Sequence, residues 1–142
     1  QRWARCDIKS ISLLPNVLAR QKARDAKVQE AWQIDEQGMV TEGAATNAWI
    51  VDNHGFLRTH AAKGEILNGI IRQILLQCAS EAGLQLKEEA FSLDEAKAAK
   101  EAFSTASTMA VFPVVSIDGA KIGNGQPGPI AQRLAAAYDL VN

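Results

Sequence analysis

Hydrophobic and polar residues alternate at two different periods along this chain, and each period predicts one type of secondary structure. Residues 5–12 place Cys6 and Ile8 between polar side chains, which is close to the period of two of a half-buried strand, and this strand would carry Lys9. Over residues 16–27 the apolar positions change to helical spacing with charged residues between them. This spacing predicts an amphipathic helix.

Four short apolar stretches then form two pairs, and the residues between the members of each pair are rich in Asp, Asn and Gly. Turn residues of this kind between alternating stretches predict antiparallel hairpins. The paired stretches are 30–34 with 39–41, and 47–51 with 56–59.

The second half of the chain predicts helices and strands in a mixed order. Gly69 precedes a run of apolar residues at helical spacing that stops at Gly83, and this is the clearest helix in the sequence. Ser92 and Glu95 have the spacing of a capping box, which predicts the start of a short helix. The remaining predicted elements are a strand over 84–91, the capped helix through 102, a β-rich run over 110–117, a hairpin turn at 118–119, a loop over 123–128 and a final helix over 129–140. Hairpins mixed with helices indicate an α+β fold.

Composition restricts the class of protein. The chain has 142 residues, 47% of them hydrophobic and 22% charged, which is enough to bury the core of one globular unit. The formal net charge is -1 and the Lys and Arg residues are scattered, so we expect small molecules or proteins as partners and no nucleic acid.

Cellular location and completeness can also be predicted. Cys6 and Cys78 are too few for a disulfide framework, and no apolar run approaches the roughly 20 residues of a membrane helix. We therefore expect a cytoplasmic protein with no membrane partner. Because the chain has no starting Met and opens on Gln1, we also expect it to be part of a longer protein.

Several kinds of chemistry are poorly represented in the sequence. His54 and His60 are the only histidines, and neither lies in a ligand-spaced cluster with cysteines or carboxylates, so no metal site is predicted. The glycines match neither the dinucleotide-binding fingerprint nor the P-loop spacing. A nucleotide-dependent enzyme is therefore not indicated.

Four segments that mean little individually occur in an order typical of one enzyme family. They are residues 5–19, which include Asp-Ile-Lys-Ser and Leu-Leu-Pro-Asn-Val-Leu-Ala, residues 41–47 (Thr-Glu-Gly-Ala-Ala-Thr-Asn), residues 66–72 (Ile-Leu-Asn-Gly-Ile-Ile-Arg), and residues 104–108 followed by Pro113. Together they resemble the C-terminal large domain of fold-type IV (class IV) pyridoxal-phosphate aminotransferases, in the D-amino acid aminotransferase branch. The resemblance implies a hairpin-rich mixed sheet, or pseudo-barrel, with packed helices over residues 1–142. It also implies that the family's smaller N-terminal domain is absent from this chain.

The resemblance implies that pyridoxal 5'-phosphate is the cofactor and that Lys9 carries it. The lysine amine must be unprotonated to attack an aldehyde, and it then moves a proton between substrate and cofactor. Taken alone, a lysine that alternates with apolar residues is ordinarily a solvated strand residue, and the flanking residues are what indicate the catalytic role. Glu42 resembles the carboxylate that pairs with the pyridine nitrogen and keeps it protonated, so that the ring can accept electrons.

The other implied cofactor contacts lie later in the chain. Leu67 would pack against the flat ring, and the backbone N–H groups of Ile70 and Ile71 would bind the phosphate at a helix N-terminus. Ser107 and Thr108 resemble the hydroxyl pair that completes the phosphate site.

The predicted activity, by the parent enzyme, is transamination between a D-amino acid and a 2-oxo acid, with D-alanine and 2-oxoglutarate as the expected pair. The family resemblance also implies a homodimer. Two alternatives share Lys9 and Glu42, namely a branched-chain L-amino acid aminotransferase and an aminodeoxychorismate lyase. A third is a non-catalytic domain that keeps the fold, although retention of both residues argues against it. The isolated chain is expected to turn over poorly, because the N-terminal domain supplies most groups that hold the substrate's carboxylate.

Overall fold

A computed structural model describes residues 5–11 and 14–141 of the chain, with the side chain of Val141 excepted. Its elements in chain order are α1 (Leu14–Asp25), β1 (Trp32–Ile34), β2 (Met39–Gly43), β3 (Asn47–Val51), β4 (Leu57–Thr59), α2 (Ile70–Glu81), β5 (Leu86–Glu88), β6 (Phe91–Ser92), α3 (Leu93–Ala98), β7 (Glu101–Ala106), β8 (Met109–Val114), β9 (Ser116–Ile117), β10 (Ala120–Lys121) and α4 (Pro129–Val141). The order confirms the α+β fold, the two predicted hairpins, the hairpin turn at 118–119 and the three longer predicted helices.

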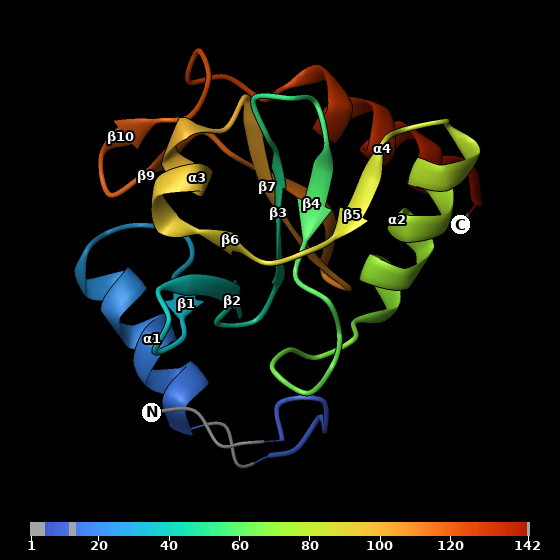
Figure 1. Ribbon diagram of the computed structural model, residues 1–142. Coiled ribbons are helices and arrows are strands. Elements are labelled where there is room, and N and C mark those ends of the chain that lie inside the picture. Colours follow the sequence, from blue (N-terminus) through green and yellow to red (C-terminus); the bar gives the residue numbers. More distant parts are fainter. Residues whose placement is uncertain (1–4, 12–13, 142) are drawn as a thin grey trace.

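Strands β1 to β8 form one mixed sheet that folds over on itself (Figure 1). The β4–β5 pair is parallel, and the other pairs are antiparallel. Strand β2 pairs with β1, β3 and β6, while β3 pairs with β2, β4 and β7. A strand has only two edges, so different parts of β2 and β3 must serve different partners. The ladder between β2 and β3 consists of the register pair Glu42 and Asn47, and this is where the sheet divides.

The two faces of β3 enter two hydrophobic clusters. Trp49 points into a cluster with Leu75 of α2 and Leu134 of α4, each of which has 0% of its surface exposed. Ile50 points to the opposite face and packs in a cluster with Phe91. Successive side chains of a strand alternate between faces, so a strand covered on both sides is apolar at nearly every position. Figure 1 shows α2 and α4 together at one side of the sheet and α3 at the other.

The predicted strand over 5–12 is wrong for the part that the structure describes. Residues 5–11 form turns and bends. The Arg5 guanidinium binds the Asp7 carboxylate through Nε and Nη2 at 2.8 and 2.7 Å, and the Ile8 amide donates to the Arg5 carbonyl at 3.1 Å. Alternating polarity produces a strand only where a neighbouring strand supplies backbone hydrogen bonds, and the described part of the chain supplies none here. The local ion pair and turn form instead.

The helix predicted through residue 102 ends earlier. The capping box is present, since Glu95 N–H donates to Ser92 Oγ at 3.1 Å and Ser92 N–H donates to Glu95 Oε2 at 2.8 Å. The helix stops at Ala98, and Glu101–Ala106 forms strand β7 between β3 and β8. Alanine and glutamate favour helix locally, but pairing on both edges overrides that preference. The strand predicted over 84–91 is also divided, into β5 and β6.

Candidate cofactor site

A cavity of about 350 Å³ opens at the end of the molecule where the sheet divides. Five parts of the chain line it: the turn at residues 6–9, Asn16 of α1, the end of β2 with the following turn (42–47), the start of α2 (67–71), and the end of β7 (105–107). Figure 1 shows the segment before α2 lying close to the N-terminal turn, at the bottom of the view. The cavity is within the size range of small-molecule sites.

Six of the seven residues predicted for the site line this one cavity. They are Lys9, Glu42, Leu67, Ile70, Ile71 and Ser107. These residues come from segments up to about a hundred positions apart in the sequence, so the fold brings together the parts that the sequence motifs identify separately.

Hydrogen bonds from Leu67 and Asn47 hold the Glu42 carboxylate. Its side chain is buried in β2, and Oε2 accepts from the Leu67 backbone N–H at 2.9 Å and from Asn47 Nδ2 at 3.4 Å. The same Asn47 amide donates to the Leu67 carbonyl at 2.7 Å. Buried carboxylates are stable only with such donors. The network couples the carboxylate to the segment that carries Leu67, the residue predicted to pack on the ring.

The start of α2 presents backbone amides at the cavity. Gly69 is the N-cap and provides no side-chain cap for the first turn. The first amides of a helix have no partner within the helix, and the positive end of the helix dipole lies there, so anions bind well at such a position. A side chain at Gly69 would be obstructed, since a Cβ would meet Asn47 Oδ1 at 2.5 Å. Ile71 is buried, while Ile70 is 73% exposed beside the cavity.

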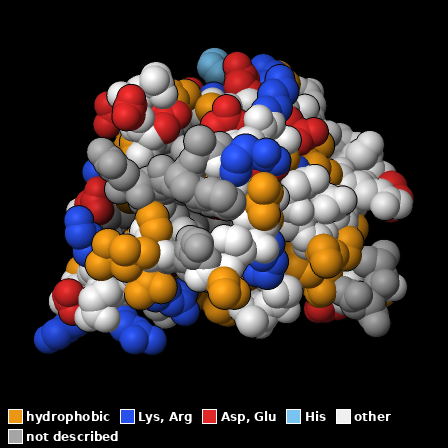
Figure 2. All heavy atoms as spheres, turned by 90° about the horizontal axis from the view of Figure 1, so that it is seen from below, with side chains coloured by type: hydrophobic (Ala, Val, Ile, Leu, Met, Phe, Trp, Pro, Cys, Tyr) orange, Lys and Arg blue, Asp and Glu red, His pale blue; other side chains and the backbone are white. Residues whose placement is uncertain are grey.

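Lys9 lines the cavity from the turn at residues 6–9, and its side chain is exposed. Cys6 and Ile8 lie beside it on the same wall. Figure 2 views this end of the molecule from below and shows hydrophobic side chains interspersed with Lys and Arg. Lys9 therefore belongs to a solvent-accessible wall of the cavity. It lies in a turn and not in the strand that the alternating pattern predicts.

The end of β7 contributes three residues, of which only Ser107 was predicted. Thr105 is 1% exposed, and its Oγ1 accepts from Trp49 Nε1 at 3.0 Å. Thr108 lies in the turn between β7 and β8 and is not among the residues that line the cavity. Its part in phosphate binding stays a prediction.

Two residues that sequence reasoning missed hold the turn after Glu42. Asn16 Nδ2 donates to the Ala44 carbonyl at 2.9 Å, and Glu30 Oε1 accepts from the Ala44 amide at 3.3 Å. The sequence could have drawn attention to Asn16, since a polar residue at a predicted helix start is a candidate helix cap. It instead bonds to a turn 28 residues away, which local rules do not predict.

The described residues hold no group of three or more His, Cys, Asp or Glu side chains arranged to bind a metal ion. Within the same residues, no helix is long and apolar enough to cross a membrane.

Comparison with known proteins defines the class. The family model for class IV aminotransferases matches residues 1–117, and the chain belongs to this family. It is 45% identical over 136 residues to the D-alanine aminotransferase of Bacillus licheniformis, covering 96% of this chain and 47% of that protein. The chain thus spans about half the length of the curated relatives it matches.

Solved structures support the same class. The branched-chain amino acid aminotransferase of Escherichia coli superposes with a TM-score of 0.87 at 28% identity, over 99% of this chain and 50% of that one. The branched-chain aminotransferase of the archaeon Thermoproteus uzoniensis, solved with norvaline, gives 0.85 at 32% identity, over 91% of this chain and 42% of that one. The agreement confirms the predicted fold class.

Proposed function

We propose that the cavity binds pyridoxal 5'-phosphate and that the parent protein is an aminotransferase acting on a D-amino acid and a 2-oxo acid. The observation that carries the proposal is that Lys9, the buried Glu42 and the N-terminus of α2 line one cavity. These features match an aldehyde, a ring nitrogen and a phosphate, the three polar parts of that cofactor.

Three features of the cavity wall suit this cofactor: a fixed carboxylate, a helix N-terminus and apolar surface. Buried Glu42 has its Oε2 fixed by two donors, so the carboxylate is held in one orientation. Gly69 gives the first turn of α2 no side-chain cap, so the amides of that turn suit an anion. Leu67, Ile70 and the alanines at 44, 45 and 106 give the cavity apolar surface that suits an aromatic ring.

Each residue would have a separate task. Pyridoxal phosphate, when bound, supplies an aldehyde for amines and a ring that withdraws electrons from the carbon being deprotonated. Lys9 Nζ would anchor the aldehyde end and then accept and return a proton at that carbon. Glu42 would hold a proton on the ring nitrogen, Leu67 would fix the ring plane, and the amides of Ile70 and Ile71 would hold the phosphate.

The choice of substrate rests on relatedness. Identity to the D-alanine aminotransferase, at 45%, exceeds the 28% and 32% to the two branched-chain enzymes, and this favours D-alanine with 2-oxoglutarate over the branched-chain alternative. We propose that the parent protein works as a homodimer and that substrate selection depends on a region equivalent to the half of the relatives that this chain does not match.

Cofactor binding can be tested on the chain itself by titration with pyridoxal phosphate, following the visible absorbance that develops when a lysine amine binds this aldehyde. We expect the absorbance in the parent chain and in Lys22→Ala, an exposed lysine on α1, but not in Lys9→Ala. Glu42→Gln should shift the band, whereas Glu36→Gln, in an exposed turn, should not. A Lys9→Ala chain that keeps the absorbance after desalting would show that the lysine assignment is wrong.

The substrate can be tested on the full-length parent protein with a panel of D- and L-amino acids and 2-oxo acids, scored by chiral chromatography. The proposal predicts D-amino acid products. Exclusive use of L-leucine would favour the branched-chain alternative, and cofactor binding without turnover of any pair would favour a non-catalytic domain.

A further inference from the structure

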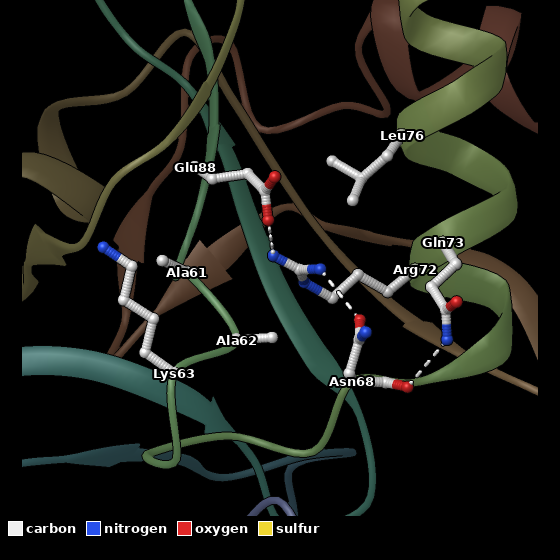
Figure 3. A pocket seen from close by; sticks show the side chains of 8 residues that line it. All are labelled: Ala61, Ala62, Lys63, Asn68, Arg72, Gln73, Leu76 and Glu88. Carbon is white, nitrogen blue, oxygen red and sulfur yellow. Dashed lines mark hydrogen bonds and ion pairs between the residues drawn. The ribbon is translucent and has the colours of Figure 1, made fainter.

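A second cavity, of about 490 Å³, lies beside the cofactor site, with Arg72 in its wall. Arg72 belongs to the first turn of α2 and is only 1% exposed, although it carries a permanent charge. Figure 3 shows its guanidinium between Glu88 and Asn68, while the Lys63 side chain extends away from it. Burial of a cation costs free energy that an opposite charge and well-placed hydrogen bonds must offset.

The guanidinium holds both ends of one segment. Nη2 donates to the His60 carbonyl at 2.8 Å, at the point where the chain leaves β4, and Nη1 donates to Asn68 Oδ1 at 3.0 Å, at the point where the chain enters α2. Nη2 also binds Glu88 Oε2 at 2.6 Å, which fastens the arrangement to β5. Arg72 therefore clamps segment 60–68, here called the pre-α2 segment, to the sheet.

The pre-α2 segment forms part of the cofactor cavity. It carries Leu67, whose amide donates to Glu42, and it ends beside Gly69 at the N-terminus of α2. Asn68 lines both cavities, whereas Arg72 lines only the second one. Arg72 thus does not line the cofactor cavity itself, but it contacts Asn68, which does.

We infer that Arg72 is a positioning residue that sets the Leu67 amide and side chain against Glu42 by clamping the pre-α2 segment. The role rests on the proposed function, since it concerns the same cavity. A lysine could keep the pair with Glu88, but a single ammonium on a flexible stem cannot reproduce the planar fork that reaches Asn68 and His60 together. Glu88 is 48% exposed, so water can solvate its carboxylate when the clamp is changed. Changing Arg72 should therefore affect the position of Leu67 more than the global stability of the chain.

The clamp can be measured without cofactor, by hydrogen exchange of the Leu67 and Gly69 amides. Both amides are bonded within this region, to Glu42 and to the Leu67 carbonyl respectively. In Arg72→Lys we expect their exchange to rise about tenfold, as for the loss of one or two buried hydrogen bonds, with no change at the β3 amides. Arg133→Lys is the matched control, because Arg133 also donates to a carbonyl, that of Ala82, away from the cavity. Unchanged protection of Leu67 in Arg72→Lys would overturn the inference.

A second pair of variants keeps the test valid if Arg72→Lys folds poorly. Glu88→Ala removes one anchor of the clamp, whereas Glu89→Ala removes a neighbouring exposed carboxylate that faces Arg58 instead. Only the first should loosen the Leu67 amide, and only the first should weaken pyridoxal phosphate binding, by about threefold to tenfold. Equal effects of both variants would refute the clamp. Loss of Leu67 protection in a chain that never binds pyridoxal phosphate would support the clamp and contradict the proposed binding of this cofactor in the cavity.

Discussion

Replacement of Gly69 by Ala tests the packing of the site with a single methyl group. The backbone at Gly69 has φ -59° and ψ 145°, a conformation that alanine adopts freely, so the substitution introduces no backbone strain. The added Cβ would lie 2.5 Å from Asn47 Oδ1, and the next nearest atoms, at 3.7 and 3.9 Å, are at ordinary contact distance. Any large effect must therefore come from displacement of the Asn47 side chain.

The magnitude follows from what Asn47 holds. Its amide donates at 2.7 Å to the Leu67 carbonyl and more weakly, at 3.4 Å, to Glu42. Loss of one good buried hydrogen bond and one weak one costs about 1–2 kcal/mol. Alanine is also a poorer N-cap than glycine, which adds up to about 1 kcal/mol. We expect Gly69→Ala to lower the free energy of unfolding by about 2–3 kcal/mol.

A double-mutant cycle separates the two contributions. Urea unfolding of Gly69→Ala, Asn47→Ala and the double variant should show that Gly69→Ala costs only about 1 kcal/mol, the cap term, once Asn47 Oδ1 is gone. Pyridoxal phosphate titration should show the same dependence, because Asn47 also supports Glu42. An equal cost of Gly69→Ala in both backgrounds would refute the steric explanation.

Three further predictions concern stability and pH. Leu75→Ala, at a site with 0% exposure, should lower the free energy of unfolding measured in urea by about 2–5 kcal/mol. Leu140→Ala, at 87% exposure, should change it by under about 0.5 kcal/mol. Similar values for the two variants would contradict the assigned core. Glu101→Gln should cost about 2–3 kcal/mol in the same assay, because the buried carboxylate accepts from two amides at the start of α4, at 3.1 and 3.0 Å; an unchanged midpoint would show that this cap is dispensable. The hydrogen bond from the N-cap amide of α3, together with Arg58, holds the pKa of Glu95 below its usual value. The stabilisation from the ionised Glu95 is therefore present above the ordinary glutamate pKa and is lost as pH falls through the lowered pKa. Glu95→Gln should flatten the acid side of the profile of unfolding free energy against pH, by about 1 kcal/mol or less because the side chain is 45% exposed. An identical profile would disprove this linkage.

Local patterns were sufficient for elements whose causes are local. The helix after Gly69 has an apolar face of its own, and the turn at 35–38 is closed by Asp35 Oδ1, which accepts from the amides of Gln37 and Met39. Capping by Ser92 likewise involves residues three apart. In each case the stabilising partner lies within a few residues, and sequence spacing reveals it.

Elements whose partners lie far away in sequence were mispredicted. Strand β7 exists because β3, 50 to 58 residues earlier, pairs with residues 101–105, and a helix-favouring composition hides this. The position of Asn47, 20 residues from the carbonyl to which it donates, is similarly invisible to local rules. The motif around Lys9 predicts its role by resemblance, but the turn that holds it contains an ion pair between Arg5 and Asp7 that an alternating pattern does not reveal.

The position of the cavity follows from the same long-range pairing. Strands β2 and β3 meet at the single register pair Glu42 and Asn47 and then diverge toward different partners. The buried polar side chains of this last register pair need hydrogen-bond partners, and the pre-α2 segment provides them: the Leu67 amide donates to Glu42, and the Leu67 carbonyl accepts from Asn47. The buried carboxylate and the cavity are therefore two consequences of one break in the sheet. A variant that loosens the pre-α2 segment should accordingly disturb Glu42 before it disturbs the core, because the two hydrophobic clusters lie on either side of β3 and do not depend on that segment's clamp.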